Sequence, residues 1–206
     1  MKKRIGETSH KQTAFGIIPR SKLIPLEIEG IKRAWDFVLQ KSDKSKMLIT
    51  PDLIKKLHEV GFAWIFPDTG GKFRKIDVRV SKHDPPKFFL VSQLISDFTE
   101  DLKIRTKHLP KIENKDFFEE LISLLSWAHH RFLWIHPFQD YNGRIGRLLI
   151  NIILLNLDLP PIELKVETKA GRKKYIEALQ SADDGDYRKL EKIIRSALEE
   201  ATEEVK

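Results

Sequence analysis

The sequence predicts a mainly α-helical fold, a helical bundle with a buried central helix and a small β-hairpin flap. Apolar residues recur at helical spacing along most of the 206-residue chain, whereas the alternation typical of a strand occurs only within residues 67–86. The longest apolar run, Leu148 to Leu157, is apolar around most of a helix circumference. A helix of that kind belongs at the centre of a bundle.

Residues 1–47 are predicted to form an N-terminal arm followed by one helix. Residues 1–22 are polar and basic, which is typical of a loose arm. The basic residues 2–4 are not followed by an apolar stretch, so we expect no export signal. Residues 26–40 predict a helix, because apolar side chains recur there at helical spacing: Leu26, Ile31, Trp35, Phe37 and Val38.

A main domain is predicted from residue 48 to residue 195. Its first helix starts after Thr50, a suitable N-cap, with Pro51 at the first helical position, and ends near Gly61. Residues 67–80, PDTGGKFRKIDVRV, then combine turn residues with alternating apolar side chains, and the sequence DPP at 84–86 ends the segment. We expect a short β-hairpin or an extended flap there.

The rest of the chain predicts further helices separated by prolines and polar loops. Pro137 cannot continue the helix before it, because proline lacks an N–H group and restricts the preceding residue. The last helix extends beyond the main domain, with residues 196–206 as its end. The predicted helices cover residues 88–102, 115–133, 142–157, 170–182 and 186–205.

Composition excludes several classes of protein. Without cysteine, the chain has no disulfides and no thiolate metal sites. Its longest apolar run is too short to span a bilayer, so we expect no membrane association and a soluble, cytoplasmic protein. The net charge is +7, but the 37 basic and 30 acidic residues are mixed throughout, which favours a charged, solvated surface and makes nucleic-acid binding unlikely.

The stretch WIHPFQDYNGRIGRLL, residues 134–149, concentrates polar chemistry at the start of the most apolar helix. Free N–H groups and the dipole at a helix start attract anions. Arg144 and Arg147 are three residues apart and project from one face, which suits a polyphosphate. Asp140 could hold Mg²⁺ together with phosphate oxygens, and His136 could accept a hydroxyl proton near pH 7.

Each of these residues alone has a structural explanation, as a hydrogen-bonded histidine, a salt-bridged arginine or a turn aspartate. Five of them at one helix start favour a Mg-nucleotide site with a general base. The adjacent His129 and His130 point to different faces of a helix, which favours structural roles over a metal cluster.

The same stretch resembles the signature of the Fic family, H-x-F-x-[D/E]-G-N-G-R-x-x-R, and the resemblance extends over roughly residues 50–195. It implies a Fic-like helical fold and a protein adenylyltransferase that moves AMP from ATP to a Ser, Thr or Tyr hydroxyl of a protein substrate. The residues that match the signature in order and spacing are His136, Phe138, Asp140, Asn142, Gly143, Arg144 and Arg147.

The resemblance also implies a role for each site residue. His136 would be the catalytic base, and Asp140 would hold Mg²⁺ on the α- and β-phosphates of ATP. The residues implied in nucleotide binding are Asn142, Gly143, Arg144, Arg147, Tyr175 and Asp183, the last two in the adenine pocket. The flap that would pair with an extended target segment comprises Arg74, Lys75, Ile76, Asp77, Val78 and Arg79.

Tyr141 departs from the pattern, because the family usually has glycine at this position. A tyrosine disfavours a positive φ, so either the backbone stays in an ordinary region or the nucleotide lies differently. Two other functions therefore remain open. One is removal of AMP, or transfer from another nucleotide or phosphodiester donor, at the same site. The other is a nucleotide-responsive binding module without transfer.

Many Fic proteins carry an inhibitory helix with the pattern [S/T]-x-x-x-E-[G/N], whose glutamate pairs with the second arginine of the signature. Glu200 fits the first five positions from Ser196, but Ala201 fails the sixth. Glu29 precedes a glycine, but Pro25 occupies the Ser/Thr position. Glu200, Glu29 or neither could have this role, and the oligomeric state is not indicated.

Overall fold

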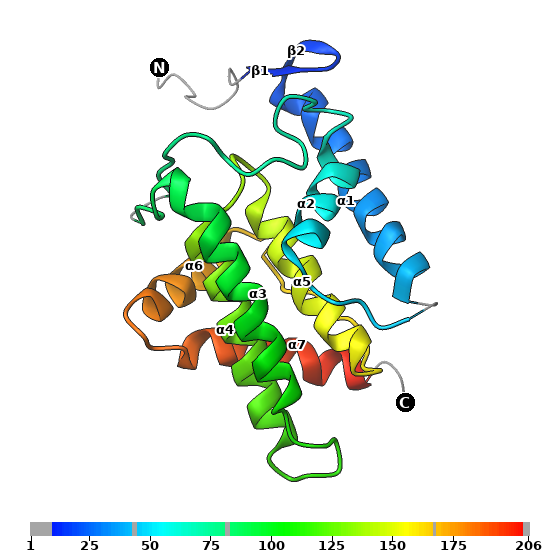
Figure 1. Ribbon diagram of the computed structural model, residues 1–206, viewed down its shortest axis with the longest axis vertical. Coiled ribbons are helices and arrows are strands. Elements are labelled where there is room, and N and C mark those ends of the chain that lie inside the picture. Colours follow the sequence, from blue (N-terminus) through cyan, green and yellow to red (C-terminus); the bar gives the residue numbers. More distant parts are fainter. Residues whose placement is uncertain (1–9, 43–44, 81–82, 167, 204–206) are drawn as a thin grey trace.

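The computed structural model describes residues 10–42, 45–80, 83–166 and 168–203, so the first nine residues of the predicted arm lie outside the described part. Its mainly helical bundle confirms the predicted fold class (Figure 1). In chain order the elements are β1 (His10–Thr13), β2 (Gly16–Pro19), α1 (Arg20–Ser42), α2 (Pro51–Phe62), the 3-10 helix η1 (Phe88–Leu90), α3 (Val91–Lys107), α4 (Phe117–Ile135), α5 (Asn142–Asn156), α6 (Lys169–Asp183) and α7 (Arg188–Glu203).

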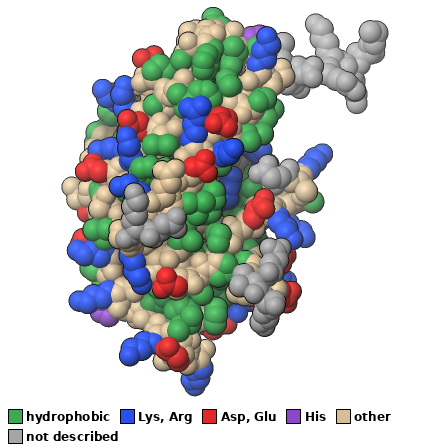
Figure 2. All heavy atoms as spheres, turned by 90° about the vertical axis from the view of Figure 1, so that its right-hand side faces the viewer, with side chains coloured by type: hydrophobic (Ala, Val, Ile, Leu, Met, Phe, Trp, Pro, Cys, Tyr) green, Lys and Arg blue, Asp and Glu red, His purple; other side chains and the backbone are tan. Residues whose placement is uncertain are grey.

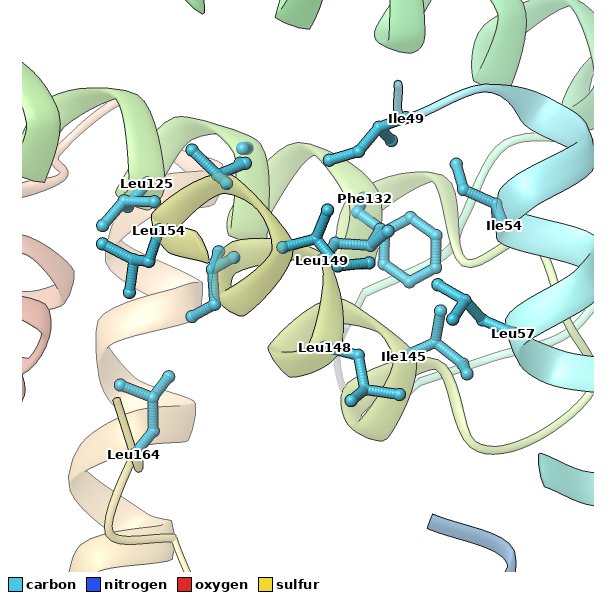
Figure 3. Packing of buried hydrophobic residues seen from close by; sticks show 14 of the residues in the cluster. Ile49, Ile54, Leu57, Leu125, Phe132, Ile145, Leu148, Leu149, Leu154 and Leu164 are labelled. Atoms are coloured by element: carbon cyan, nitrogen blue, oxygen red, sulfur yellow. The ribbon is translucent and has the colours of Figure 1, made fainter. Parts of the chain in front are cut away.

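Helix α5 is the buried central helix. It lies between α4 on one side and the α1–α2 pair on the other (Figure 1). Ile145 and Leu149 of α5 meet Phe132 of α4 and Leu57 of α2 in one apolar interior (Figure 3). Burying each such side chain stabilises the fold by roughly 1.5–3 kcal/mol, so the apolar circumference of α5 explains its central position.

Helices α1 and α2 approach each other through small residues. A Cβ atom placed on Gly30 would lie 2.3 Å from the carbonyl oxygen of Gly61, so only glycine fits at this crossing. The fully buried residues of α1 are Leu23, Glu27, Gly30, Ala34 and Val38. Of the apolar residues that predicted this helix, Val38 is fully buried, and the other four are partly buried and pack against the core: Leu26, Ile31, Trp35 and Phe37.

The β-hairpin forms at a different place from the one predicted. Strands β1 and β2 pair antiparallel, with Thr13 opposite Gly16, inside the segment expected to be a loose arm. Residues 67–80 form turns and extended chain instead, with one isolated bridge between Val80 and His83. The flap is held by side-chain contacts described below, which explains why it needs no regular strand pairing.

Two asparagines of α5, Asn151 and Asn156, fix neighbouring segments through their side-chain amides. Asn156 accepts from the N–H of Met47 at 2.7 Å and donates to the carbonyl of the same residue at 2.8 Å. Asn151 makes the same pair of bonds with Ile162, at 2.7 and 3.1 Å. Each amide satisfies both of its polar ends on backbone, which makes a buried polar side chain favourable.

The surface view shows one face of the molecule, with Lys and Arg, Asp and Glu, and hydrophobic side chains interspersed (Figure 2). This face has no large area of a single charge, as the mixed sequence predicts. Among the described residues, no helix combines the length and apolar character that a membrane crossing requires.

Candidate active site

The loop between α4 and α5 is built on buried side chains. His136 ends α4 in the left-handed region, with φ 51° and ψ 60°, which turns the chain sharply. Phe138 is fully buried, and its N–H and carbonyl both bind the side-chain amide of Asn142 at 2.9 Å. Asn142 thus holds the loop closed with its side chain, whereas the resemblance implied that it cradles phosphate.

His136 lines a cavity of about 670 Å³ at this loop. Its Nδ1 lies 3.3 Å from the carbonyl oxygen of Leu133, a contact that needs a proton on Nδ1 and leaves Nε2 as the acceptor. Burial, reinforced by Arg74 and His83, lowers the pKa of His136 from 6.5 to about 4. The imidazole is therefore neutral at pH 7, the state in which it can take a proton.

The N-terminus of α5 offers an anion site in the same cavity. Among the described residues, the N–H groups of Asn142 and Gly143 make no hydrogen bond, as is usual in the first turn of a helix. Arg144 and Arg147 line the cavity with them. A Cβ atom on Gly143 would lie 3.6 Å from Nη1 of Arg147, so the missing side chain leaves the backbone open beside a guanidinium.

A carboxylate that the sequence motifs do not reveal, Glu27 of α1, faces this arginine pair. Its side chain is 3% exposed, and Oε2 lies 2.9 Å from Nη2 of Arg144. Oε1 accepts a hydrogen bond from the hydroxyl of Tyr141 at 2.9 Å. A buried carboxylate needs such partners. In the sequence, Glu27 could have been found only from its spacing, because it falls in line with the buried residues Leu23, Gly30 and Ala34 of α1.

Tyr141 takes the left-handed backbone that the family's glycine would favour, with φ 62° and ψ 10°. The idea that the backbone stays in an ordinary region is therefore wrong. Its ring stacks on Phe62 at 4.0 Å between centroids, and its hydroxyl is bound to Glu27. These contacts, together with the bond from the Tyr141 N–H to Oδ1 of Asp140 at 2.9 Å, offset the strain of a left-handed tyrosine.

Asp140 is the candidate metal ligand, and its side chain is 51% exposed. One carboxylate oxygen accepts from the Tyr141 N–H, and the other forms an ion pair with Lys11 of β1. The described residues contain no cluster of three or more acidic or histidine side chains that could hold a metal by themselves. The outer oxygen of Asp140 binds the Lys11 ammonium and is therefore accessible to a cation. A divalent ion bound there would take its remaining ligands from phosphate oxygens and water.

The cavity extends from the arginines to α6, where Tyr175 and Asp183 line it. Tyr175 is 7% exposed, and its hydroxyl lies 2.5 Å from Nε2 of His129. Burial raises the pKa of Tyr175 to about 12, although the positive charge of Arg147 acts in the opposite direction. Tyr175 lines the cavity at the end where the resemblance implied an adenine pocket.

His129 and His130 have structural roles, as their different helix faces predicted. His129 is bound to Tyr175. His130 lies 2.9 Å from the Tyr187 hydroxyl through Nδ1 and 2.9 Å from Oδ1 of Asp183 through Nε2. Asp183, expected in the adenine pocket, is thus held at the α6 end of the cavity by this histidine.

The flap is anchored by Arg74, whose side chain is fully buried. Its Nε donates to the carbonyl of His136 at 2.8 Å and its Nη1 to that of Ile76 at 3.0 Å, and Nη2 binds the carbonyl of Pro86. The Arg74 side chain is therefore not available to a target, and its place in the predicted flap stays a prediction for the backbone alone. An arginine has five N–H donors, and here they tie the flap to the catalytic loop.

The outer flap residues remain available to a partner. Lys75, Ile76 and Arg79 are exposed, and Val78 is half-buried. Asp77 is half-exposed and binds the Lys87 ammonium at 2.8 Å and the N–H of Phe88 at 3.0 Å, which fixes the flap against η1.

The two predicted inhibitory glutamates have other partners in the structure. Glu200 lies 2.8 Å from Nζ of Lys165, and Glu29 lies 3.0 Å from Nε of Arg33 on its own helix. The carboxylate that does reach a signature arginine is Glu27, and it pairs with the first arginine, Arg144, rather than the second.

Comparisons with known proteins agree with this geometry. A sequence model described as Fic/DOC family matches residues 48–154. "Protein adenylyltransferase Fic" of Aedes aegypti is 30% identical over 173 residues, which cover 84% of this chain and 32% of the relative. The protein of the same name from Nematostella vectensis is 29% identical over 188 residues, which cover 91% of this chain and 40% of the relative. The chain thus spans well under half the length of these relatives.

Two solved structures are similar to this fold. Fic-1 from C. elegans aligns with a TM-score of 0.67 and 25% identity, over 86% of this chain and 49% of that one. BepC protein from Bartonella tribocorum, solved with bound AMPPNP, aligns with a TM-score of 0.72 and 15% identity, over 94% of this chain and 93% of that one.

Proposed function

The chain belongs to the Fic/DOC family, and from that membership we propose that it is a protein adenylyltransferase, which transfers AMP from ATP to the hydroxyl of a Ser, Thr or Tyr residue in a target protein. One observation carries the proposal. A neutral imidazole, a half-exposed carboxylate and two guanidiniums line a single cavity at the free N-terminus of a buried helix.

The nucleotide would bind with its phosphates at the start of α5. The free N–H groups of Asn142 and Gly143 and the guanidiniums of Arg144 and Arg147 supply the hydrogen bonds and positive charge that a triphosphate needs. The adenine would lie toward α6, between Tyr175 and Asp183. The AMPPNP bound in the BepC structure, an ATP analogue in the same fold, supports this proposal.

Asp140 would hold Mg²⁺ through the carboxylate oxygen that Lys11 now occupies. Bound there with phosphate oxygens, the ion would neutralise charge on the leaving pyrophosphate. Lys11 must move away from Asp140 for this to happen.

In the reaction, Nε2 of His136 takes the proton of the target hydroxyl as its oxygen attacks the α-phosphorus. The new O–P bond forms while the bond between the α-phosphorus and the bridging oxygen breaks, and pyrophosphate leaves with the electron pair. Positioning and charge stabilisation account for most of the acceleration in such transfers. The target segment would lie along the exposed flap residues, close to the carbonyl of His136 that Arg74 holds.

The proposal is tested with ATP labelled at either phosphorus. We incubate the purified chain and a lysate of the source cells with Mg-ATP carrying ³²P at the α- or at the γ-position. Compared with lysate alone, the chain should add α-label to protein and no γ-label. Added γ-label would indicate a kinase, and no added label of either kind would contradict the proposal.

A further inference from the structure

His58 of α2 lies beneath the candidate active site, and the chemistry proposed above does not use it. It is 2% exposed, and its ring stacks on Phe138 at 3.9 Å between centroids with an angle of 14° between the planes. Phe62 closes the other side at 5.3 Å. Two aromatic neighbours fix the plane of the imidazole and thereby the directions of its two nitrogens.

Both ring nitrogens are engaged by backbone from different parts of the site. The N–H of Gly71 donates to Nδ1 at 3.0 Å, and Nε2 lies 3.3 Å from the carbonyl oxygen of Asp140. Since Nδ1 accepts a hydrogen bond, the proton of the neutral ring must be on Nε2, which then donates to Asp140.

The two backbone partners of His58 belong to different parts of the candidate site: Gly71 to the flap and Asp140 to the catalytic loop. Gly71 has φ 73° and begins the flap, where a Cβ atom would come within 2.8 Å of Cβ of Glu59. Phe73, two residues further on, packs against Phe138 at 5.5 Å. Asp140 carries the carboxylate of the catalytic loop. The His58 ring is therefore a fixed spacer between the segment that would hold the target and the loop that would hold the nucleotide.

We propose that His58 is a positioning residue that sets the flap and the catalytic loop relative to each other, so that the target hydroxyl is aligned with the α-phosphorus. The expected kinetic effect rests on the proposed function. The coupling of the flap to the catalytic loop rests on the geometry alone. A change in either hydrogen bond should alter alignment, and misplacement on the scale of an ångström costs up to about 100-fold in rate.

Three variants separate the two contacts. The side-chain oxygen of His58→Asn can take the place of Nδ1 and keep the Gly71 bond, and the amide nitrogen of His58→Gln can take the place of Nε2 and keep the Asp140 bond. His58→Leu loses both. His108→Gln serves as the control, because His108 is exposed at the end of α3 and its Nδ1 contacts only the carbonyl of Ile104 within the described chain.

The kinetic readout is the split between kcat and KM for the protein target. We expect His58→Gln to raise the target KM about tenfold with little change in kcat, because the flap is released. We expect His58→Asn to lower kcat about tenfold with little change in target KM, because the catalytic loop is released. His58→Leu should show both effects and His108→Gln neither. The proposal would be overturned if His58→Asn and His58→Gln lost the same fraction of activity and that fraction equalled their loss of folded protein.

Two spectroscopic readouts are independent of transfer activity. Imidazole ¹⁵N chemical shifts should show a protonated Nε2 and an unprotonated Nδ1 at His58 near pH 7. Hydrogen exchange at the Gly71 amide should accelerate in His58→Gln and stay slow in His58→Asn. If transfer fails while these results hold, the proposed function is wrong and the coupling stands. If Nδ1 is protonated, or Gly71 exchanges equally fast in every variant, the coupling is wrong.

Discussion

Glu27 and Arg144 form an ion pair at the start of α5, with Oε2 and Nη2 2.9 Å apart. The pair joins the N-terminal helix to the proposed phosphate site and occupies one side of a guanidinium that a nucleotide would need. Among the described residues, it is also the only ion pair between α1 and a signature arginine. The consequences of removing it are therefore specific.

Glu27→Gln should bind Mg-ATP more tightly than the unmodified chain. The amide keeps a hydrogen-bond acceptor for Tyr141 but no longer competes for Arg144, a gain of about 1 kcal/mol or roughly fivefold in affinity. Titration calorimetry with Mg-ATP measures this. Glu29→Gln is the matched control on the same helix, where the carboxylate pairs with Arg33 and with no other residue of the described chain. A weaker ATP affinity in Glu27→Gln would show that the carboxylate orients Arg144 instead of competing for it.

Asn142→Ala should lose activity and stability together, whereas Asn156→Ala should lose stability alone. Both amides make the same pair of bonds to a single backbone residue, at opposite ends of α5. Each loss should cost about 1–3 kcal/mol, because buried backbone groups are left without partners. Urea unfolding and initial transfer rates at matched folded fractions distinguish the two. Equal residual activities would mean that the Phe138 loop does not depend on Asn142.

Tyr141→Gly should destabilise the chain although it restores the residue usual in the family. Glycine relieves about 1–2 kcal/mol of left-handed strain, but losing a buried aromatic ring costs about 3–5 kcal/mol. We expect a net loss of roughly 2 kcal/mol in chemical denaturation. Tyr141→Phe retains the stack on Phe62 and loses only the bond to Glu27, so its cost should be about 1–3 kcal/mol. Stabilisation by Tyr141→Gly would show that the stack contributes little.

The pH profile of transfer should reflect the low pKa of His136. Burial favours the neutral ring, which remains the active base until the pH approaches about 4. The acid limb of kcat/KM reports the base in the free enzyme. We therefore expect kcat/KM to be nearly constant between about pH 5.5 and 7.5, provided that the chain stays folded by circular dichroism. A limb centred near the ordinary histidine value of 6.5 would contradict this environment for His136.

Local patterns predicted the helices well and placed the candidate site residues in one short segment. Thr50 accepts the hydrogen bond from the Leu53 N–H at 3.1 Å, as an N-cap should. Pro137 does separate α4 from α5. These features depend on neighbouring residues, and the polar signature at the start of α5 is likewise one continuous segment. Its side chains converge because a short loop and one helix turn carry them all.

Local sequence patterns did not predict the contacts between distant segments. The close approach of α1 and α2 depends on Gly30 and Gly61, two small residues on separate helices, and the apolar spacing within one helix does not indicate it. From the sequence, Arg74 was expected to be an exposed cation of the flap. In the structure its side chain is buried and donates to backbone carbonyls of separate segments. Glu27 was missed for the same reason, because its partners lie more than a hundred residues away.

The most direct test of adenylyl transfer with His136 as the base is intact-mass spectrometry of a modified target after incubation with Mg-ATP. The unmodified chain should add the mass of one adenylyl group to the target. His108→Ala should do the same, because His108 is exposed at the end of α3 and is not among the described residues that line the cavity. His136→Ala, folded to the same extent, should add nothing. Adenylyl addition by His136→Ala at an undiminished rate would contradict the account.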